Sequence, residues 1–239
     1  MRQQQPEWIS LIYAPAHDEP AVLKALASNA HAVIFDLEDF VPSAQKSAAR
    51  NALAFNARQA HETGKGSIVR INRRLDLAVA DIEVAVCKEV DAIMITKAAN
   101  AEHIVLLDEW VSELEGQRGL DAGRIKFIAM IETADAVANI KEIARSTPRM
   151  IAMNIGAEDI AKEMHIPSDS PTLFHIKENM IVSAFAAGIS PWGHNGSVKT
   201  FGSGQGFTEL LQSSKTLGFR SATCLTADQV EYINLIYTT

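Results

Sequence analysis

The sequence predicts a closed α/β barrel in which eight parallel strands alternate with eight helices. Three observations favour it: short apolar runs recur along the chain, a helical pattern follows each run, and one strand–helix unit takes about 30 residues. Eight such units fit a closed barrel better than a doubly wound sheet. A chain of 239 residues with 47% hydrophobic content can bury one large core. We therefore expect residues 1–239 to form a single domain.

The expected strands are short apolar runs whose length suits buried strands of a parallel sheet. In chain order they contain LIYA, AVIFDL, SIVRI, AIMIT, KFIAMI and RMIAMNI, followed by the weaker runs GISPW and FRSATC. They span residues 11–14, 32–37, 67–71, 92–96, 126–131, 149–155, 188–192 and 219–224. The count of eight depends on the last two.

Helical patterns fill the intervals between these runs, and several begin with a start signal. Ser43 follows Pro42, and Thr133 follows Glu132, so each places a hydroxyl where a helix N-cap is expected. The expected helices span residues 18–29, 43–63, 77–89, 101–116, 133–146, 171–187, 204–217 and 226–237.

Composition excludes several classes of protein. The formal charge is −7, and 22 basic residues are outnumbered by 29 acidic ones without clustering, which argues against a nucleic-acid binder. The opening MRQQQPEWIS lacks the apolar segment of a secretory leader, and no run reaches the length of a membrane span. A cytoplasmic protein without membrane contact is the expectation. Cys87 and Cys224 are expected to be buried thiols rather than a disulfide.

Polar side chains gather after the expected strands, at the end of a barrel where active sites lie. Glu132 follows the fifth run and Asp159 the sixth, and Mg²⁺ needs only one or two protein carboxylates besides water and substrate oxygens. No His or Cys stands beside them, which favours Mg²⁺, with Mn²⁺ as an alternative, over Zn²⁺. The competing interpretation is that both acids stabilise the N-termini of the helices that follow. The full set comprises Asp36, Glu38, Asp39, Arg70, Asn72, Lys97, Glu132, Asn154, Glu158 and Asp159.

Arg70 is the one arginine in this set. A guanidinium at a barrel mouth is suited to two-point capture of a substrate carboxylate, although a structural ion pair with Asp36 or Glu38 explains it equally well. Asp36 could instead bond a neighbouring backbone, while Asp39 caps a helix and Lys97 remains a solvated surface lysine. The chain shows no nucleophile elbow, phosphate-binding loop or metal-type histidine spacing.

Several of these blocks resemble the citrate lyase β-subunit-like branch of the HpcH/HpaI aldolase superfamily. The blocks are YAP at 13–15, HAVIFDLEDFVPSAQKSAAR at 31–50, VRIN at 69–72, FIAMIETADAVANIKEIA at 127–144 and IGAEDIAKEM at 155–164. The stretch GFRSATCLTADQVEYIN at 218–234 is a weaker match. The DLED, VRIN, IET and GAED blocks in this order are specific, and the resemblance covers nearly the whole chain.

The resemblance implies a TIM barrel that cleaves or forms a carbon–carbon bond next to a 2-oxo acid such as oxaloacetate, pyruvate or glyoxylate, with Mg²⁺. By position, Glu132 and Asp159 resemble the metal ligands, Arg70 the residue that grips the substrate carboxylate, and Glu38 the supporting acid of the DLED block. The candidate catalytic residues are therefore Arg70, Glu38 and Asp36. The candidate substrate-binding residues are Arg70, Asn72 and Glu132.

The chain also departs from the family pattern at the rim where a CoA or acyl-carrier thioester is bound. Ala16 stands in place of a usual Gly, and Ala222, Thr226 and Ala227 stand in place of a Lys, His and Pro. Whether the substrate is a thioester of the citryl, malyl or citramalyl type is therefore an open question. The departures do not affect the expected metal site. The chain also ends at Thr239, without the C-terminal lid of longer relatives, so we expect a base from elsewhere.

Three functions compete on this evidence. The first is a Mg²⁺-dependent carbon–carbon lyase, and the second keeps the metal site but acts as a condensing synthase or a thioester hydrolase. The third is a non-catalytic barrel subunit of a multi-enzyme complex. Family analogy also suggests a homo-oligomer, a trimer or a hexamer.

Overall fold

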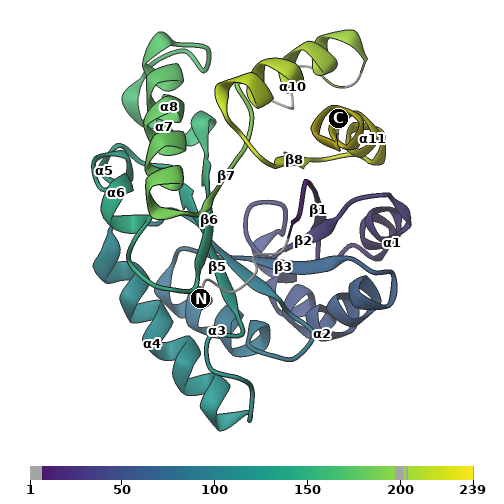
Figure 1. Ribbon diagram of the computed structural model, residues 1–239. Coiled ribbons are helices and arrows are strands. Elements are labelled where there is room, and N and C mark those ends of the chain that lie inside the picture. The colour runs from purple at the N-terminus through teal and green to yellow at the C-terminus, as the bar shows by residue number, and fades with distance from the viewer. Residues whose placement is uncertain (1–6, 197–201, 203, 239) are drawn as a thin grey trace.

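The computed structural model describes residues 7–196, 202 and 204–238, in which eight parallel strands form a nearly closed barrel with helices outside it (Figure 1). The sheet order is β7-β6-β5-β4-β3-β2-β1-β8. The (β/α)8 prediction is confirmed. The strands are β1 Ser10–Pro15, β2 Ala32–Asp36, β3 Gly66–Ile71, β4 Ala92–Ile95, β5 Lys126–Ile131, β6 Met150–Ile155, β7 Ser190–Trp192 and β8 Ala222–Cys224.

The two weak runs give the shortest strands and close the barrel. A parallel bridge joins Trp192 to Ser221, and the Gly193 N–H donates to the Ser221 carbonyl at 2.9 Å. Pro191 has no N–H to donate, which limits the pairing of β7, but its carbonyl accepts from Arg220 N–H at 2.9 Å. This explains why the expected strands at 188–192 and 219–224 are cut to three residues each.

The helices follow the expected positions with two differences. The segment expected at 133–146 is split into α5 and α6, and the short α7, which buries only Ile160 and Ala161, was not expected. None of the helices within the described residues is long and apolar enough to span a membrane. A 3₁₀ turn, η1 Ser43–Gln45, precedes α2. The helices are α1 Glu19–Ala27, α2 Lys46–Glu62, α3 Leu75–Ala85, α4 Ala101–Gln117, α5 Ala134–Ala138, α6 Ile140–Ile143, α7 Ala157–Met164, α8 Pro171–Ala187, α10 Gln205–Leu217 and α11 Ala227–Thr238.

Strand alternation sorts the core into two clusters. Residues such as Phe35 and Val69 point outward and pack with the helices, whereas Ile34, Ile68 and Ile128 belong to a separate cluster inside the barrel. Both cysteines are free thiols; Cys224 is buried, as expected, whereas Cys87 is only partly buried. The inward series of β2 and β3 continue beyond their apolar residues into Asp36 and Arg70, and that of β5 continues into Glu132 just past the strand end. A polar layer therefore tops an apolar barrel interior.

A buried ionic cluster stabilises the opposite end of the barrel, where Arg149 directly precedes β6. Its guanidinium donates to both Glu115 carboxylate oxygens, at 2.8 and 2.6 Å, and also contacts Asp108. Arg149 is 3% exposed and Glu115 is 1% exposed. Burial alone would lower the pKa of Arg149, but its bonds to Glu115 and Asp108 raise it. The cluster thus ties α4 to the start of β6.

We expect Arg149→Met to lower the free energy of unfolding by about 3 kcal/mol, because it leaves the buried Glu115 without its counter-charge. Urea denaturation followed by circular dichroism measures this. The matched control is Arg74→Met, which removes an equally short pair with Asp76 in which both side chains are exposed, so no measurable change is expected. Equal effects of the two substitutions would contradict the assignment.

Candidate functional site

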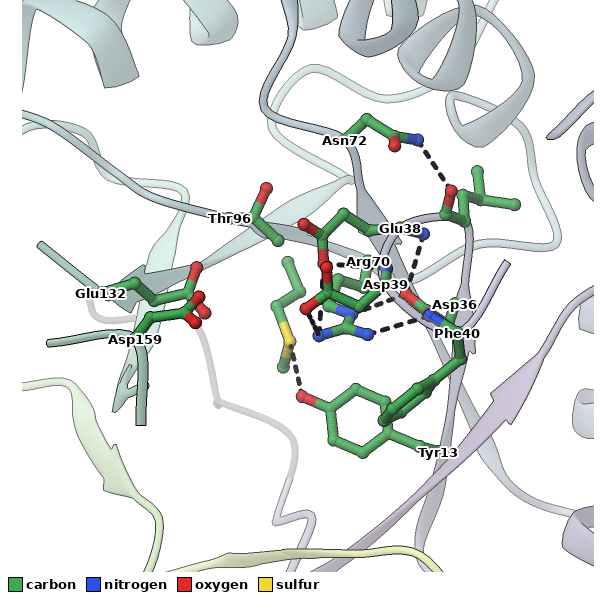
Figure 2. Close-up of polar contacts among 12 residues, drawn as sticks. Tyr13, Asp36, Glu38, Asp39, Phe40, Arg70, Asn72, Thr96, Glu132 and Asp159 are labelled. Carbon is green, nitrogen blue, oxygen red and sulfur yellow. Dashed lines mark hydrogen bonds and ion pairs between the residues drawn. The ribbon is translucent and has the colours of Figure 1, made fainter. Parts of the chain in front are cut away.

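The candidate site lies at the carboxyl ends of the strands, where the loops after β2, β3, β4, β5 and β6 meet. Figure 2 shows Glu132 and Asp159 beside each other, with Arg70 and its neighbouring acids across from them. Glu132 is 6% exposed, Arg70 is 5% exposed and Asp36 is fully buried. These are the residues that the sequence singled out, brought together from segments far apart in the chain.

Arg70 is held by a two-point ion pair with Asp36 on the neighbouring strand. Its Nε lies 2.6 Å from Asp36 Oδ1, and its Nη2 lies 2.9 Å from Asp36 Oδ2. The rings of Tyr13 and Phe40 lie within 5.0 Å of the guanidinium carbon. Burial would lower the pKa of Arg70, but the bond to Asp36 and nearby charges raise it. The group is fixed and charged, so the ion-pair interpretation of Arg70 is correct.

One part of this guanidinium remains more open. Nη1 lies 3.4 Å from Glu38 Oε2 and 3.7 Å from Asp39 Oδ2, longer than ordinary hydrogen bonds. An incoming carboxylate could therefore accept hydrogen bonds from the N–H groups of Nη1. The ion pair with Asp36 and the capture of a substrate by Arg70 are thus compatible.

The DLED turn is built by the same Asp36. Its carboxylate accepts from the N–H of Glu38 at 2.9 Å and of Phe40 at 2.7 Å, which matches the backbone-bonding interpretation of this acid. Lys46 of α2 donates from Nζ to the carbonyls of Leu37 and Glu38, at 2.7 Å each. Asp39 does not cap a helix, since η1 begins four residues later. The turn is fixed from both sides.

The carboxyl group of Glu38, in this turn, has a raised pKa. Burial raises its pKa to about 7, and the charge of Asp39 adds to the shift, while Arg70 opposes it. Near neutral pH the Glu38 carboxyl is therefore divided between its charged and neutral forms.

Asn72 braces the turn from β3. Its amide donates to the Leu37 carbonyl at 2.7 Å and to Asp81 Oδ2 at 2.6 Å, and Arg50 Nε holds the other oxygen of Asp81 at 2.7 Å. In Figure 2 the Asn72 side-chain nitrogen points away from Glu132 and Asp159. A contact between Asn72 and substrate, as predicted, would have to use the amide oxygen.

Glu132 is positioned by backbone groups. Its Oε2 accepts the N–H of Lys97 at 2.8 Å, and the helix that follows is capped by the Thr133 hydroxyl instead, which accepts Ala136 N–H at 3.1 Å. The helix-cap interpretation is thus wrong for Glu132. A Cβ at Gly156 would lie 2.7 Å from Glu132 Oε1, so only glycine leaves this room.

Asp159 lies in the first turn of α7, where the helix dipole also favours an acid. Its carboxylate is 40% exposed, and Lys97 Nζ lies 3.5 Å from its Oδ2. Burial raises the pKa of Glu132, and the charge of Asp159 raises it further, because the two carboxylates are close. They form one acidic pocket.

This pocket has the donors that a divalent cation requires. Two carboxylates leave most of an octahedral shell for water and substrate oxygens, which suits Mg²⁺. Nowhere in the described parts of the chain do three or more His, Cys, Asp or Glu side chains form a group that could hold a metal. The Lys97 ammonium already occupies a cation position against Asp159. The donor set therefore fits Mg²⁺ and gives Zn²⁺ no nitrogen or sulfur ligand.

Sequence reasoning missed several contributors. Tyr13 and Phe40 border Arg70, yet aromatic residues near a strand end normally predict only core packing. Gly156 lies shortly before Glu158 and Asp159, but nothing in the sequence indicated that a glycine is required there. Lys46 lies within residues 31–50, the block that contains DLED, and its closeness in sequence to these acids could have identified it.

The rim positions that depart from the family pattern carry no charge toward the mouth. Ala16 and Ala222 are buried, and Ala222 pairs with Ser10 in the barrel wall. The Thr226 hydroxyl accepts Gln229 N–H at 3.3 Å at the start of α11, which begins at Ala227. Ala16 and Ala222 are thus buried, whereas Thr226 and Ala227 are exposed at the start of α11.

Comparisons with known proteins show which family this chain resembles. A family model described as HpcH/HpaI aldolase/citrate lyase matches residues 10–227. The citrate lyase subunit beta of Leuconostoc mesenteroides subsp. cremoris is 30% identical over 233 residues, covering 95% of this chain and 76% of that protein. The (3S)-malyl-CoA thioesterase of Cereibacter sphaeroides (strain KD131 / KCTC 12085) is 28% identical over 241 residues, covering 99% and 79%.

A solved structure extends the comparison. The citrate lyase beta subunit from M. tuberculosis, complexed with oxaloacetate and magnesium, is 25% identical and superimposes with a TM-score of 0.78. The match covers 98% of this chain and 98% of that one.

Glu38 predicts a pH dependence with a definite sign. Its pKa is about 7 in the folded protein against 4.5 for the free carboxyl, so between these values the folded state binds more protons than the unfolded state. The contribution of Glu38 to stability therefore falls as pH rises through this window. We expect the unfolding free energy of wild type minus that of Glu38→Gln to decrease from about pH 4.5 to 7, measured in urea with EDTA. A difference that stays constant or increases would contradict the assignment.

Proposed function

Because the chain belongs to the HpcH/HpaI aldolase/citrate lyase family, we propose that it is a Mg²⁺-dependent carbon–carbon lyase acting next to a 2-oxo acid. The oxo acid is of the oxaloacetate, pyruvate or glyoxylate type. The observation that carries the proposal is the convergence of Arg70, Glu132 and Asp159 at one barrel mouth.

In this proposal Arg70 binds the substrate carboxylate through Nη1, since Nε and Nη2 are already bonded to Asp36. Asp36 is a positioning residue, because it is fully buried and acts through the guanidinium. Nη1 lies 3.4 Å from Glu38 Oε2 and 3.7 Å from Asp39 Oδ2, and the substrate carboxylate replaces these two acids beside it. Asn72 contributes to the same end of the substrate through its amide oxygen, or only through the turn that it braces.

Glu132 and Asp159 are proposed to hold Mg²⁺, or Mn²⁺ in its place. When bound, the cation supplies Lewis-acid stabilisation of the charge that develops on the oxo-acid oxygens. Glu132 keeps its orientation through the Lys97 N–H, and Gly156 leaves room for its carboxylate. Glu38, with a pKa of about 7, can hold a proton at Oε1 or release it near neutral pH.

The second candidate is a thioester hydrolase on the same site. It is supported by the similarity to (3S)-malyl-CoA thioesterase, at 28% identity over 99% of this chain. Both candidates take an acyl thioester of CoA or an acyl carrier as partner. Ala222 and Thr226 add no charge for such a group, so its recognition would use other parts of the rim. A synthase running in reverse would use the same residues.

Malyl-CoA and Mg²⁺ separate the two candidates by product. A lyase releases acetyl-CoA and glyoxylate, whereas a hydrolase consumes water and releases free CoA thiol and malate. We expect glyoxylate, detected as its phenylhydrazone, without a matching rise in free thiol. Citryl-CoA and citramalyl-CoA serve as further substrates, with oxaloacetate and pyruvate as the expected oxo acids. Turnover of none of them would favour the non-catalytic subunit.

Binding tests the site directly. Calorimetry with Mg²⁺ followed by oxaloacetate should show both ligands bound by the wild type. We expect Asp159→Asn to abolish Mg²⁺ binding, and Arg70→Lys to keep Mg²⁺ but weaken oxaloacetate by at least roughly tenfold, because a lysine lacks the planar fork. Melting curves establish that both variants fold. Unchanged oxaloacetate affinity in folded Arg70→Lys would overturn the role of Arg70.

Gly156→Ala is expected to weaken cation binding on the order of tenfold, because its Cβ would lie 2.5 Å from Glu132 Cγ and force the carboxylate to move. The control is Gly116→Ala in α4, where a Cβ meets nothing within 4 Å. It should leave cation affinity unchanged and not lower the melting temperature, since alanine favours helix. Full affinity in Gly156→Ala would show that Glu132 is not a ligand.

A further inference from the structure

We infer that Lys97 is a positioning residue that sets the cation affinity of the site: its ammonium is an internal counter-ion that a divalent cation must displace from Asp159. The inference rests on the proposed function, because it takes Glu132 and Asp159 as the cation ligands. It assigns two separable tasks to one residue, one to the side chain and one to the backbone.

The Lys97 side chain joins acids from two different loops. Its Nζ lies 3.5 Å from Asp159 Oδ2 and 3.9 Å from Glu38 Oε1. Asp159 follows β6 and Glu38 follows β2, so the ammonium reaches across the mouth between the acidic pocket and the Arg70 side. A surface lysine that merely extends into solvent would not be near both.

The Lys97 backbone serves the third acid. Its N–H donates to Glu132 Oε2 at 2.8 Å, and this geometry is reached with a positive φ of 46°. That left-handed conformation is uncommon and unfavourable for a residue with a Cβ. A glycine would adopt it without strain, yet the chain has a lysine there. A lysine therefore stands at a backbone position that favours glycine, with its ammonium near two acids.

Electrostatics define that task. Burial would lower the pKa of Lys97, but the charges of Glu132, Glu38 and Asp159 raise it, so the ammonium stays charged. Without it, these carboxylates would repel one another. A divalent cation bound by Glu132 and Asp159 competes for the same negative charge. The ammonium thus stabilises the cation-free site and weakens cation binding.

Displacement leaves the ammonium at the mouth, where Lys97 is partly exposed. Its Nζ also lies 3.9 Å from Glu38 Oε1, on the side of the mouth where Arg70 lies. Cation binding in this way frees a positive charge for the substrate.

The test measures Mn²⁺ affinity by electron paramagnetic resonance of free Mn²⁺, without substrate. We expect Lys97→Met to bind Mn²⁺ roughly tenfold more tightly than the wild type, because the competing ammonium, 3.5 Å from Asp159 Oδ2, is gone. Lys97→Gly should tighten binding similarly, since it keeps the N–H to Glu132 and loses only the side chain. Lys97→Arg should restore affinity to within about twofold of the wild type.

The matched control is Lys88→Met, whose ammonium lies 3.8 Å from Glu89 on the segment that leads into β4, at the other end of the barrel. It should bind Mn²⁺ like the wild type. In EDTA, Lys97→Met should melt below the wild type, and saturating Mn²⁺ should raise its melting temperature more than that of the wild type.

Unchanged or weaker Mn²⁺ binding by Lys97→Met, with normal binding by the wild type, would overturn the inference and leave the proposed function standing. Absence of Mn²⁺ binding by the wild type would overturn both. Tighter binding by Lys88→Met as well would show that only net charge matters and would also overturn the role of Lys97.

Discussion

The ion pair between Asp36 and Arg70 is the interaction on which the rest of the site depends. The β2–β3 register places these residues opposite each other, and both side chains point into the barrel above its apolar interior. A buried charge without a partner would be severely destabilising, so neither can be present alone. The same Asp36 carboxylate bonds the backbone of the DLED turn, which carries Glu38. One carboxylate thus fixes both the guanidinium and the acid beside it.

On the opposite side of the mouth the two acids are held differently: Glu132 accepts a backbone N–H, whereas Asp159 pairs with the Lys97 ammonium at 3.5 Å. Glu132 depends on the Lys97 N–H and on the absence of a side chain at Gly156. Burial and the nearby charge of Asp159 raise the pKa of Glu132, and a cation bound between the two carboxylates would be favoured by their charges. In the cation-free protein Lys97 partly balances them. The site is therefore divided into a fixed half, which includes Arg70, and a half whose charge balance can change with a bound cation.

Much of this could be predicted from the sequence, because it depends on local pattern. Apolar runs and helix start signals placed all eight strands, and acids at strand ends identified Glu132. The helix α7 was missed because its eight residues are fewer than the window over which a helical period is normally read. Some contacts depend on backbone conformation, such as the Lys97 N–H to Glu132, which requires a positive φ. Residue type does not predict such contacts. The sequence offered an ion pair or a substrate contact for Arg70, and only the separate positions of its three nitrogens show that the two are compatible.

The central claim is that the two halves hold one substrate, the carboxylate on Arg70 and the oxo group on a cation at Glu132 and Asp159. A crystal soaked with Mn²⁺ and oxaloacetate tests it most directly, because Mn²⁺ is located by its anomalous scattering. The account predicts an anomalous peak bonded to Glu132 and Asp159, with an oxaloacetate carboxylate on Arg70 Nη1. A peak elsewhere, or oxaloacetate bound without contact to Arg70, would contradict it.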